Sequence, residues 1–268
     1  MTELLQYSFF RNALAGSLLM AIACGMVGAY IVTRRLVFIS GGVTHASFGG
    51  LGMGFYLGVN PVVTAMIFSV LSAFAVGWVS RAREVREDSA IAGVWALGMA
   101  VGVIFIFMTP GYAPNLSSYL FGNILTVSAG DIWWMAILSA ALTATFALLY
   151  KQIVCVAFDR EFAATRGIPV ALIEYIMLFH IAITIVLSIR LVGIMLLMSM
   201  LTIPQMIASL FTSSFSRLIY LSIAIGFISS AAGLTLSYYL NIPTGAFIIL
   251  ILVTTFLLTK LIKTTLSK

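Results

Sequence analysis

The chain has 268 residues, of which 62% are hydrophobic and only 8% are charged, with a formal net charge of +6. A soluble globular domain carries about 25% charged residues, because a folded surface needs polar groups that face water. The composition therefore excludes an ordinary soluble domain and indicates a polytopic helical membrane protein. The basic residues lie mostly at the ends of apolar runs rather than on one polar face, so we expect no nucleic-acid partner.

Apolar runs of membrane-spanning length follow one another along the chain. A bilayer core about 30 Å thick needs roughly 20 helical residues. The expected spans are residues 9–32, 36–58, 62–79, 90–109, 131–150, 171–189, 191–211, 217–238 and 245–260. Segment 116–127 is too short to cross and is expected to be re-entrant or interfacial. The predicted fold is all-α, with about eight to nine transmembrane helices in a single transmembrane domain over residues 1–268.

The basic loops alternate with loops that contain no Lys or Arg, and this alternation predicts the orientation. The basic loops are residues 34–35, 81–86, 151–166, 213–217 and 260–268. Because cytoplasmic loops are enriched in Lys and Arg, we expect a cytoplasmic C-terminus and an external N-terminus. Arg11 and Arg190 are exceptions to the pattern.

The only two histidines, His45 and His180, each fall about ten residues into an expected span, near the bilayer midplane. Ionisable groups at that depth are costly and often functional, and imidazole is a common ligand for zinc and related ions. His45 lies in a span rich in glycine, which favours close helix packing or a helix break near a cavity. We therefore predict that His45 lies on the path of a solute through the membrane and binds a metal ion transiently there. His180 is kept as a second candidate for such a role. For His180, an apolar setting also fits a simple hydrogen bond to a neighbouring helix.

The most polar stretch, residues 151–170, predicts a short cytoplasmic helix. Asp159 is expected to cap a helix that begins at Arg160, and Gly167 with Pro169 is expected to end it. Such a helix between two spans is a natural docking element for a soluble partner. Glu174, just beyond it, is expected to be interfacial.

Several catalytic motifs are absent from the sequence. It contains no Gly-x-x-x-x-Gly-Lys-[Ser/Thr] loop, no His-Glu-x-x-His and no Gly-x-Ser-x-Gly. We therefore expect no enzyme activity and no cofactor in this chain itself. Acidic residues are nearly absent from the spans, which argues against an ion-gradient-driven carrier.

Six segments, in order, carry a family resemblance. They read FISGGVTHASFGGLGMGFYLGVNP, REDSAIAGVWALGMAVGV, SYLFGNILTVSAGD, FDREFAATRGIPV, LVGIMLLMSMLTIPQMIA and SYYLNIPTGAFIILI. Together they cover nearly the whole chain and resemble the permease subunits of bacterial ABC importers for zinc, manganese and iron.

The resemblance implies an assembly in the bacterial plasma membrane. Two permease copies would join two ATP-binding subunits, which use the ATP, and an external metal-binding protein or lipoprotein. His45 occupies the position of the family's pathway histidine. The residues that correspond to the family's coupling helix, near 158–168, are Phe158, Asp159, Glu161, Ala163 and Gly167.

The chain also departs from the family pattern at three positions. Gly41, Asn123 and Asn241 stand where family members commonly have Asp. These replacements remove anionic oxygen ligands and so argue against a preformed divalent-ion site at His45. They leave open a metal chelate or another small nutrient as the solute, and, from another class, a secondary carrier.

Overall fold

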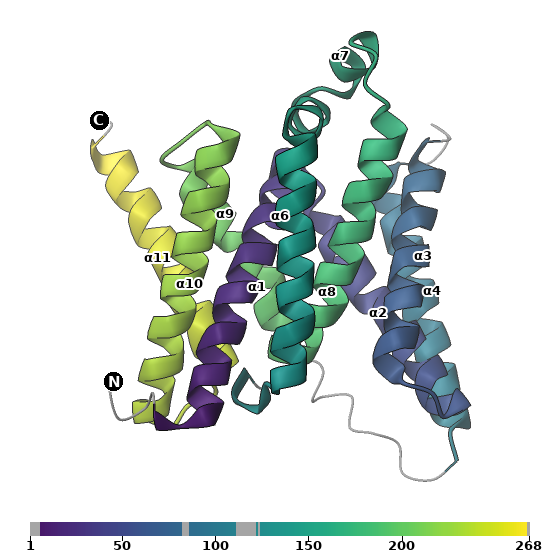
Figure 1. The fold of residues 1–268 in the computed structure, drawn as a ribbon, viewed down its shortest axis with the longest axis vertical. Helices are drawn as coiled ribbons and strands as arrows, with labels where there is room; N and C mark the ends of the chain where they lie inside the picture. Colours follow the sequence, from purple (N-terminus) through teal and green to yellow (C-terminus); the bar gives the residue numbers. More distant parts are fainter. Residues whose placement is uncertain (1–5, 82–85, 111–121, 123, 267–268) are drawn as a thin grey trace. The chain divides into compact units, whose positions relative to one another are not determined.

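The computed structural model describes residues 6–81, 86–110, 122 and 124–266. Its helices are α1 (Ser8–Thr33), α2 (Val37–Leu57), α3 (Pro61–Arg81), α4 (Glu87–Met108), the 3₁₀-helix η2 (Ile124–Thr126), α6 (Ala129–Phe158), α7 (Arg160–Thr165), α8 (Val170–Met200), α9 (Ile203–Ser209), α10 (Phe215–Leu240) and α11 (Thr244–Leu266) (Figure 1). No β-strand occurs in this part of the chain. The predicted all-α membrane fold is confirmed.

Within the described ranges, seven helical stretches are long and apolar enough to span a membrane. One of them, Val170–Ser209, contains the expected span 171–189 and most of the expected span 191–211. The helix geometry breaks inside this stretch at Gly193, with φ 76° and ψ 170°. Helix α2, which matches the expected span 36–58, is not among these seven stretches, and it contains many glycine, serine and threonine residues. Counting the broken stretch twice and adding α2 turns seven segments into the nine expected.

The described helices form two compact units. Unit 1 comprises Met1–Thr33, Ser117–Ala147 and Ser188–Lys268, and unit 2 comprises Arg34–Leu116 and Leu148–Leu187. Helices α6 and α8 contribute to both units, and each contains a backbone irregularity near the change of unit, at Leu149 and Gly193. A single domain over residues 1–268 stays a prediction.

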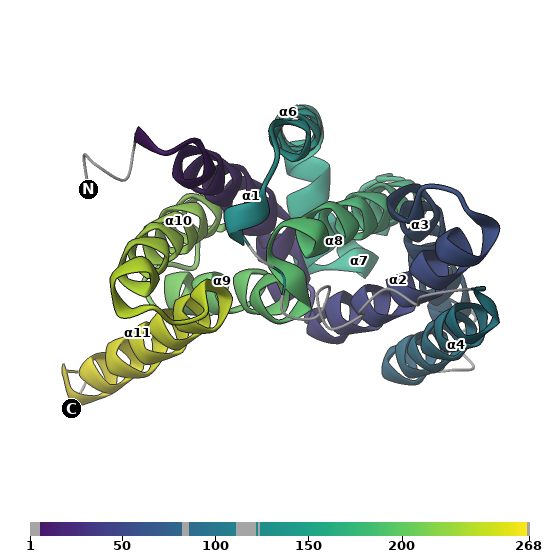
Figure 2. The same cartoon turned by 90° about the horizontal axis from the view of Figure 1, so that it is seen from below.

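In unit 2, α2 packs against α3 and α4, and Figure 2 shows these three helices side by side. The helix backbones come close together because glycine has no side chain to hold them apart. A β-carbon at Gly50 would lie 2.5 Å from Cα of Ala65 in α3, and one at Gly98 in α4 would lie 2.4 Å from Cα of Ala46 in α2. Close packing thus accounts for part of the glycine-rich stretch.

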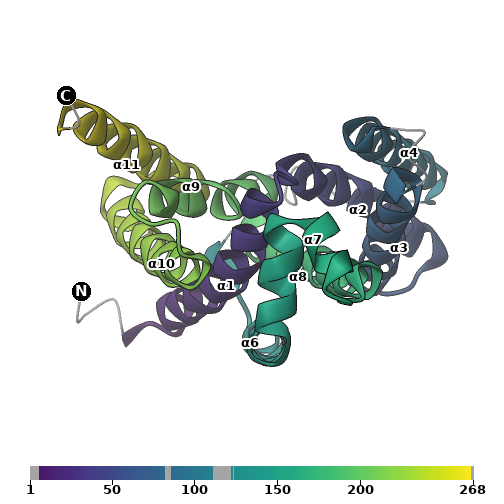
Figure 3. The same cartoon turned by 90° about the horizontal axis from the view of Figure 1, so that it is seen from above.

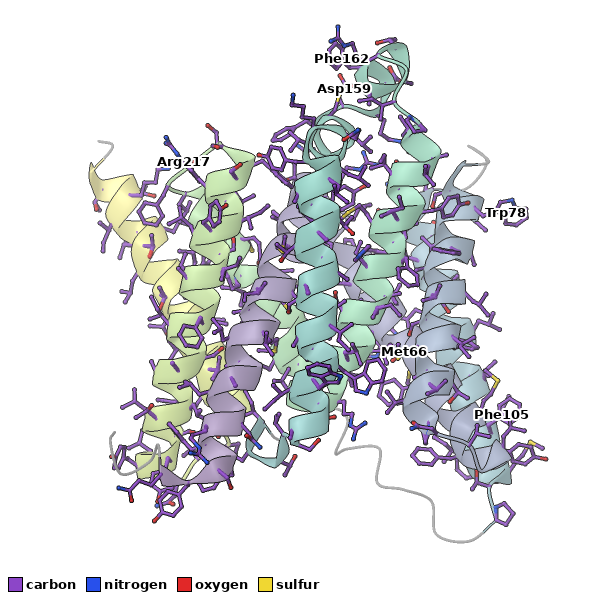
Figure 4. The ribbon with its side chains drawn as sticks, in the orientation of Figure 1. Met66, Trp78, Phe105, Asp159, Phe162 and Arg217 are labelled. Atoms are coloured by element: carbon purple, nitrogen blue, oxygen red, sulfur yellow. The ribbon has the colours of Figure 1, made fainter. Side chains whose placement is uncertain are left out.

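Helices α3 and α4 present exposed apolar side chains. Trp78 on α3 is 72% exposed, and Figure 4 shows its side chain pointing away from the helix. Apolar side chains that face outward from long helices fit a lipid environment.

In unit 1, α1 packs against α9 and α10, and α10 also packs against α11 (Figure 3). Two residues that follow the break at Gly193 lie near α10. Leu196 lines the same cavity as Leu234, whereas Met200, one turn later, contacts Ser230. The break itself lies against Gly122, where a β-carbon would come within 2.2 Å of the Gly193 nitrogen.

The expected short segment 116–127 falls largely outside the described residues. Its described end contains η2, and the carbonyl of Val127 accepts a hydrogen bond from the side-chain amide of Asn12 at 3.2 Å. This bond ties the segment to the start of α1.

Candidate functional site

The short helix expected from residues 151–170 is present as α7. The side chain of Asp159 accepts a hydrogen bond from the backbone N–H of Phe162 at 2.9 Å, which is the predicted N-cap. An N-cap of this kind satisfies a donor that the first turn of a helix leaves without a partner. The predicted start of the helix at Arg160 is confirmed.

The end of α7 is equally well defined. Gly167 adopts a left-handed conformation with φ 72°. The N–H of Ile168 donates to the carbonyl of Ala163 at 3.1 Å, and the N–H of Gly167 donates to Ala164 at 3.0 Å. This pair of bonds is the Schellman arrangement, which favours glycine because a β-carbon opposes the left-handed conformation. The predicted stop at Gly167 is confirmed.

Helix α7 lies beyond the end of α6 and the start of α8, and Figure 4 shows Asp159 and Phe162 there. Phe158 and Phe162 are 61% and 54% exposed, and Glu161 is exposed beside them. Ala163 is fully buried, so it anchors the helix instead of presenting a surface. Exposed aromatic rings on a short polar helix are typical of a protein-docking surface. Sequence reasoning missed Phe162. Phe158 ends α6 and Phe162 lies in α7, and the extended backbone of Asp159 separates the two helices, so no single helical spacing relates the two rings.

Beneath α7 lies an ion-pair network that the sequence did not predict. Glu174 of α8 is only 8% exposed, and its carboxylate pairs with Arg34 at 2.9 Å and with Arg160 at 2.8 Å. Arg34 is 140 residues away from Glu174 along the chain. A contact at that separation has no local sequence signal.

His45 lies in α2 and is half-buried. Its ring stacks on the indole of Trp95 in α4, with ring centroids 4.5 Å apart and planes inclined by 7°. Phe48 lies on the same helix with its centroid 6.4 Å from that of His45. Stacking uses the face of the imidazole and fixes its orientation, whereas the nitrogen lone pair that binds a metal lies in the plane of the ring. The stacking contact therefore does not itself occupy the nitrogen lone pair.

His180 is bound differently. It is 8% exposed, and its Nδ1 lies 2.8 Å from the carbonyl oxygen of Ile176, one turn earlier in α8. With Nδ1–H as the donor, this bond fixes one ring nitrogen within the helix itself. The contact fits a structural histidine better than a pathway ligand.

The described residues contain no group of three or more His, Cys, Asp and Glu side chains that could hold a metal ion. His45 and His180 are therefore not brought together in such a cluster. Gly41, one turn before His45, is buried in α2 and offers no ligand side chain. Asn123 lies outside the described residues.

Asn241 belongs to a different part of the molecule. It ends α10 in a left-handed conformation, with φ 53° and ψ 42°. Asn tolerates this conformation better than most residues, so its place at the end of α10 has a structural reason. Asn241 also lines a cavity of about 530 Å³ in unit 1. In the same cavity wall, the hydroxyls of Ser237 and Thr244 lie 2.9 Å apart.

Comparison with known proteins identifies the family. Residues 6–263 match the model of the ABC 3 transport family. The chain belongs to that family. The match covers nearly the whole chain, and it confirms the resemblance to ABC importer permeases drawn from the six motifs.

Curated members of the family resemble the chain over most of their length. An uncharacterized membrane protein of Synechocystis sp. is 41% identical, with 94% of this chain and 89% of the relative covered. The manganese transport system membrane protein MntC of Halalkalibacterium halodurans is 32% identical, with 96% and 88% covered. A probable metal transport system membrane protein of Chlamydia trachomatis is 33% identical, with 96% and 91% covered.

Solved structures agree with the family assignment. A chain of PsaBC from Streptococcus pneumoniae in complex with Fab superposes with a TM-score of 0.84 at 28% identity, covering 96% of this chain and 92% of that one. A putative metal-chelate type ABC transporter in an inward-facing conformation gives a TM-score of 0.75 at 15% identity, covering 93% and 85%. At that identity the second likeness shows the fold alone.

Proposed function

We propose that this chain is the membrane-spanning permease subunit of an ATP-driven importer for a divalent transition metal ion. The observation that carries the proposal is the family match over residues 6–263, joined to relatives named as manganese or metal transport system membrane proteins. Manganese, zinc and iron are the metals to test, because a relative is named as a manganese transport system membrane protein and imidazole nitrogen suits zinc and iron.

In this proposal α7 docks on an ATP-binding subunit in the cytoplasm. Phe158 and Phe162 supply exposed apolar contacts, Asp159 and Gly167 fix the helix ends, and Ala163 anchors the helix. A separate subunit supplies the ATPase activity, since no phosphate-binding loop motif occurs in this sequence. A second copy of the chain and an external metal-binding protein complete the assembly, and the C-terminus lies in the cytoplasm.

His45 has a transient role on the pathway. The stack on Trp95 holds its ring in one orientation, and the glycine-rich contacts of α2 hold the helix in one register. A single oriented imidazole can pass an ion without the tight binding that a cluster of carboxylates would impose. Such weak binding suits transport, because the ion has to leave as well as enter.

The test is the element-resolved metal content of bacterial cells that lack this chain, grown under mild chelation. The cells are restored with wild type, His45→Ala or His180→Ala. We expect a selective deficit of one metal that wild type and His180→Ala correct and His45→Ala does not. His180→Ala is the matched control, because it removes the other histidine at comparable depth.

Other outcomes discriminate between functions. Full rescue by His45→Ala would show that metal transport does not need His45. That result would favour import of a chelate or another small nutrient. An unchanged content of all three metals in cells without any second uptake system would contradict metal import. Uptake that persists without the ATP-binding subunit and collapses with an uncoupler would identify a secondary carrier.

A further inference from the structure

The buried carboxylate of Glu174 joins three segments of unit 2: Arg34 lies 140 residues from Glu174 along the chain, and Arg160 lies 14 residues from it. Arg34 precedes α2, Arg160 is the first residue of α7, and Glu174 lies in the second turn of α8. Arg34 Nη2 donates to Oε1 at 2.9 Å. Arg160 contacts both carboxylate oxygens, with Nε 2.8 Å from Oε1 and Nη2 3.1 Å from Oε2.

The two arginines are held unequally. Two-point contact from a planar guanidinium fixes direction as well as distance, so the orientation of Arg160 is locked to that of Glu174. The side chain of Arg160 is nevertheless 43% exposed, whereas that of Arg34 is 15% exposed and that of Glu174 is 10% exposed. Water can therefore reach Arg160 far more easily than the other two groups.

Because Arg160 is more exposed than Arg34, the ion pair between Arg160 and Glu174 can break and form again while the pair between Arg34 and Glu174 stays intact. A buried carboxylate without a cation is strongly unfavourable. If Arg160 withdraws with α7, Glu174 keeps Arg34 as a partner, and Arg160 becomes hydrated at the surface. The carboxylate thus remains paired in both arrangements, which is the property that a two-state connection requires.

Arg34, the less exposed partner of Glu174, lies directly before α2, the helix that contains His45. Arg34 is followed by Arg35, which adopts a left-handed conformation with φ 59°, and α2 begins at Val37. Because this turn is short, Arg34 and the first turn of α2 cannot move far independently of each other. Because α2 contacts α3 and α4 backbone against backbone, a displacement at its start is passed to the three helices together.

We infer that Glu174 is a positioning residue that ties α7 to the turn before α2, and so couples events at the docked ATP-binding subunit to the helix of His45. This inference rests on the proposed function and assigns the coupling to a particular ion-pair network. Glu174 itself touches neither the transported ion nor the nucleotide.

The test uses the whole complex, purified with its ATP-binding subunits, placed in lipid vesicles and supplied with the external binding protein. The readout is the amount of metal transported per ATP hydrolysed, with Mn²⁺, Zn²⁺ and Fe²⁺ tested separately. For Glu174→Gln we expect ATP hydrolysis to continue while this ratio falls about tenfold, a typical strength of coupling between sites. Asp88→Asn is the matched control, because it makes the same chemical change at an exposed carboxylate of unit 2, in the first turn of α4. Its ratio should equal that of wild type.

Arg160→Lys tests the same link independently. It keeps the charge but loses the two-point contact, so the ratio should lie between those of wild type and Glu174→Gln. If Glu174→Gln does not assemble, an unchanged ratio in Arg160→Lys overturns the inference on its own. A proportional loss of transport and ATP hydrolysis in Glu174→Gln also overturns it, because that result describes a merely structural residue.

If the wild-type complex transports none of the three metals, both the proposed function and the inference are contradicted. If wild type transports and the variants keep its ratio, only the inference falls.

Discussion

The α2, α3 and α4 helices of unit 2 and the α1, α9 and α10 helices of unit 1 both use glycine to pack closely, but what faces the glycine differs. In unit 2 the facing atoms are mostly backbone, such as Cα of Ala46 opposite Gly98. In unit 1 they are mostly side chains, such as Ile223 opposite Gly25 and Met200 opposite Gly226. Side chains can change rotamer to admit an added atom, whereas a helix backbone has to move as a whole. The comparison indicates that α2, α3 and α4 behave as one rigid group, while the packing of unit 1 adapts more easily.

The largest expected effect comes from Gly98→Ala. The new methyl group would lie 2.4 Å from Cα of Ala46 and 2.8 Å from its carbonyl oxygen, so α4 has to move away from α2. We expect a loss of about 1–3 kcal/mol, the usual cost of overpacking. The measurement is the midpoint of thermal unfolding of the purified protein in detergent.

Gly93→Ala is the control for that prediction. Gly93 lies on the same helix, and a β-carbon there would meet no atom within 4 Å. Since alanine favours the helix by up to about 1 kcal/mol over glycine, this variant should match or exceed wild type. Equal losses from both variants would show that helix propensity, and not contact with α2, sets the effect.

A smaller effect is expected from Gln205→Leu in unit 1. Gln205 is fully buried, and its side-chain amide donates to the carbonyls of Cys24 at 2.8 Å and Met200 at 3.2 Å. Interhelical polar contacts in membranes contribute on average about 0.6 kcal/mol, so the thermal midpoint should fall less than for Gly98→Ala.

Thr235→Val provides the comparison for Gln205→Leu. The Thr235 hydroxyl bonds only one turn back, to the carbonyl of Ala231 at 2.8 Å, and that bond holds no second helix. Its loss should leave the midpoint nearly unchanged. A Gln205→Leu variant as stable as Thr235→Val would contradict a role for Gln205 in joining α1 to α9.

The smallest effect is expected from Gly226→Ala. The nearest atom to the added carbon would be the terminal methyl of Met200, at 3.0 Å, and a methionine side chain adjusts at little cost. We expect a change within about 0.5 kcal/mol, as for substitutions that disturb no strong contact. A loss of stability as large as that of Gly98→Ala would contradict the claim that glycines facing side chains tolerate an added methyl group better than glycines facing backbone.

Sequence reasoning succeeded where the cause is local. Hydropathy located the spans because helix length is set by the bilayer, and Asp159 and Gly167 marked the ends of α7 through contacts three to five residues apart. The boundary expected near Arg190 corresponds to the break at Gly193.

Sequence reasoning failed where the cause is distant in the chain. The stack of His45 on Trp95 joins two helices, and the ion pair of Glu174 with Arg34 joins residues 140 positions apart. No periodicity or spacing encodes such pairs, because they depend on how helices pack. The roles of His45 and of the α7 residues in transport stay predictions.

The most direct test of the central claim is uptake of radiolabelled manganese into lipid vesicles that contain the complete complex. The account predicts uptake that requires ATP hydrolysis and the ATP-binding subunit, is competed by the metal that the cell-content experiment identifies, and is lost in His45→Ala but not in His180→Ala. Uptake that proceeds without ATP and follows an imposed ion gradient would contradict the account.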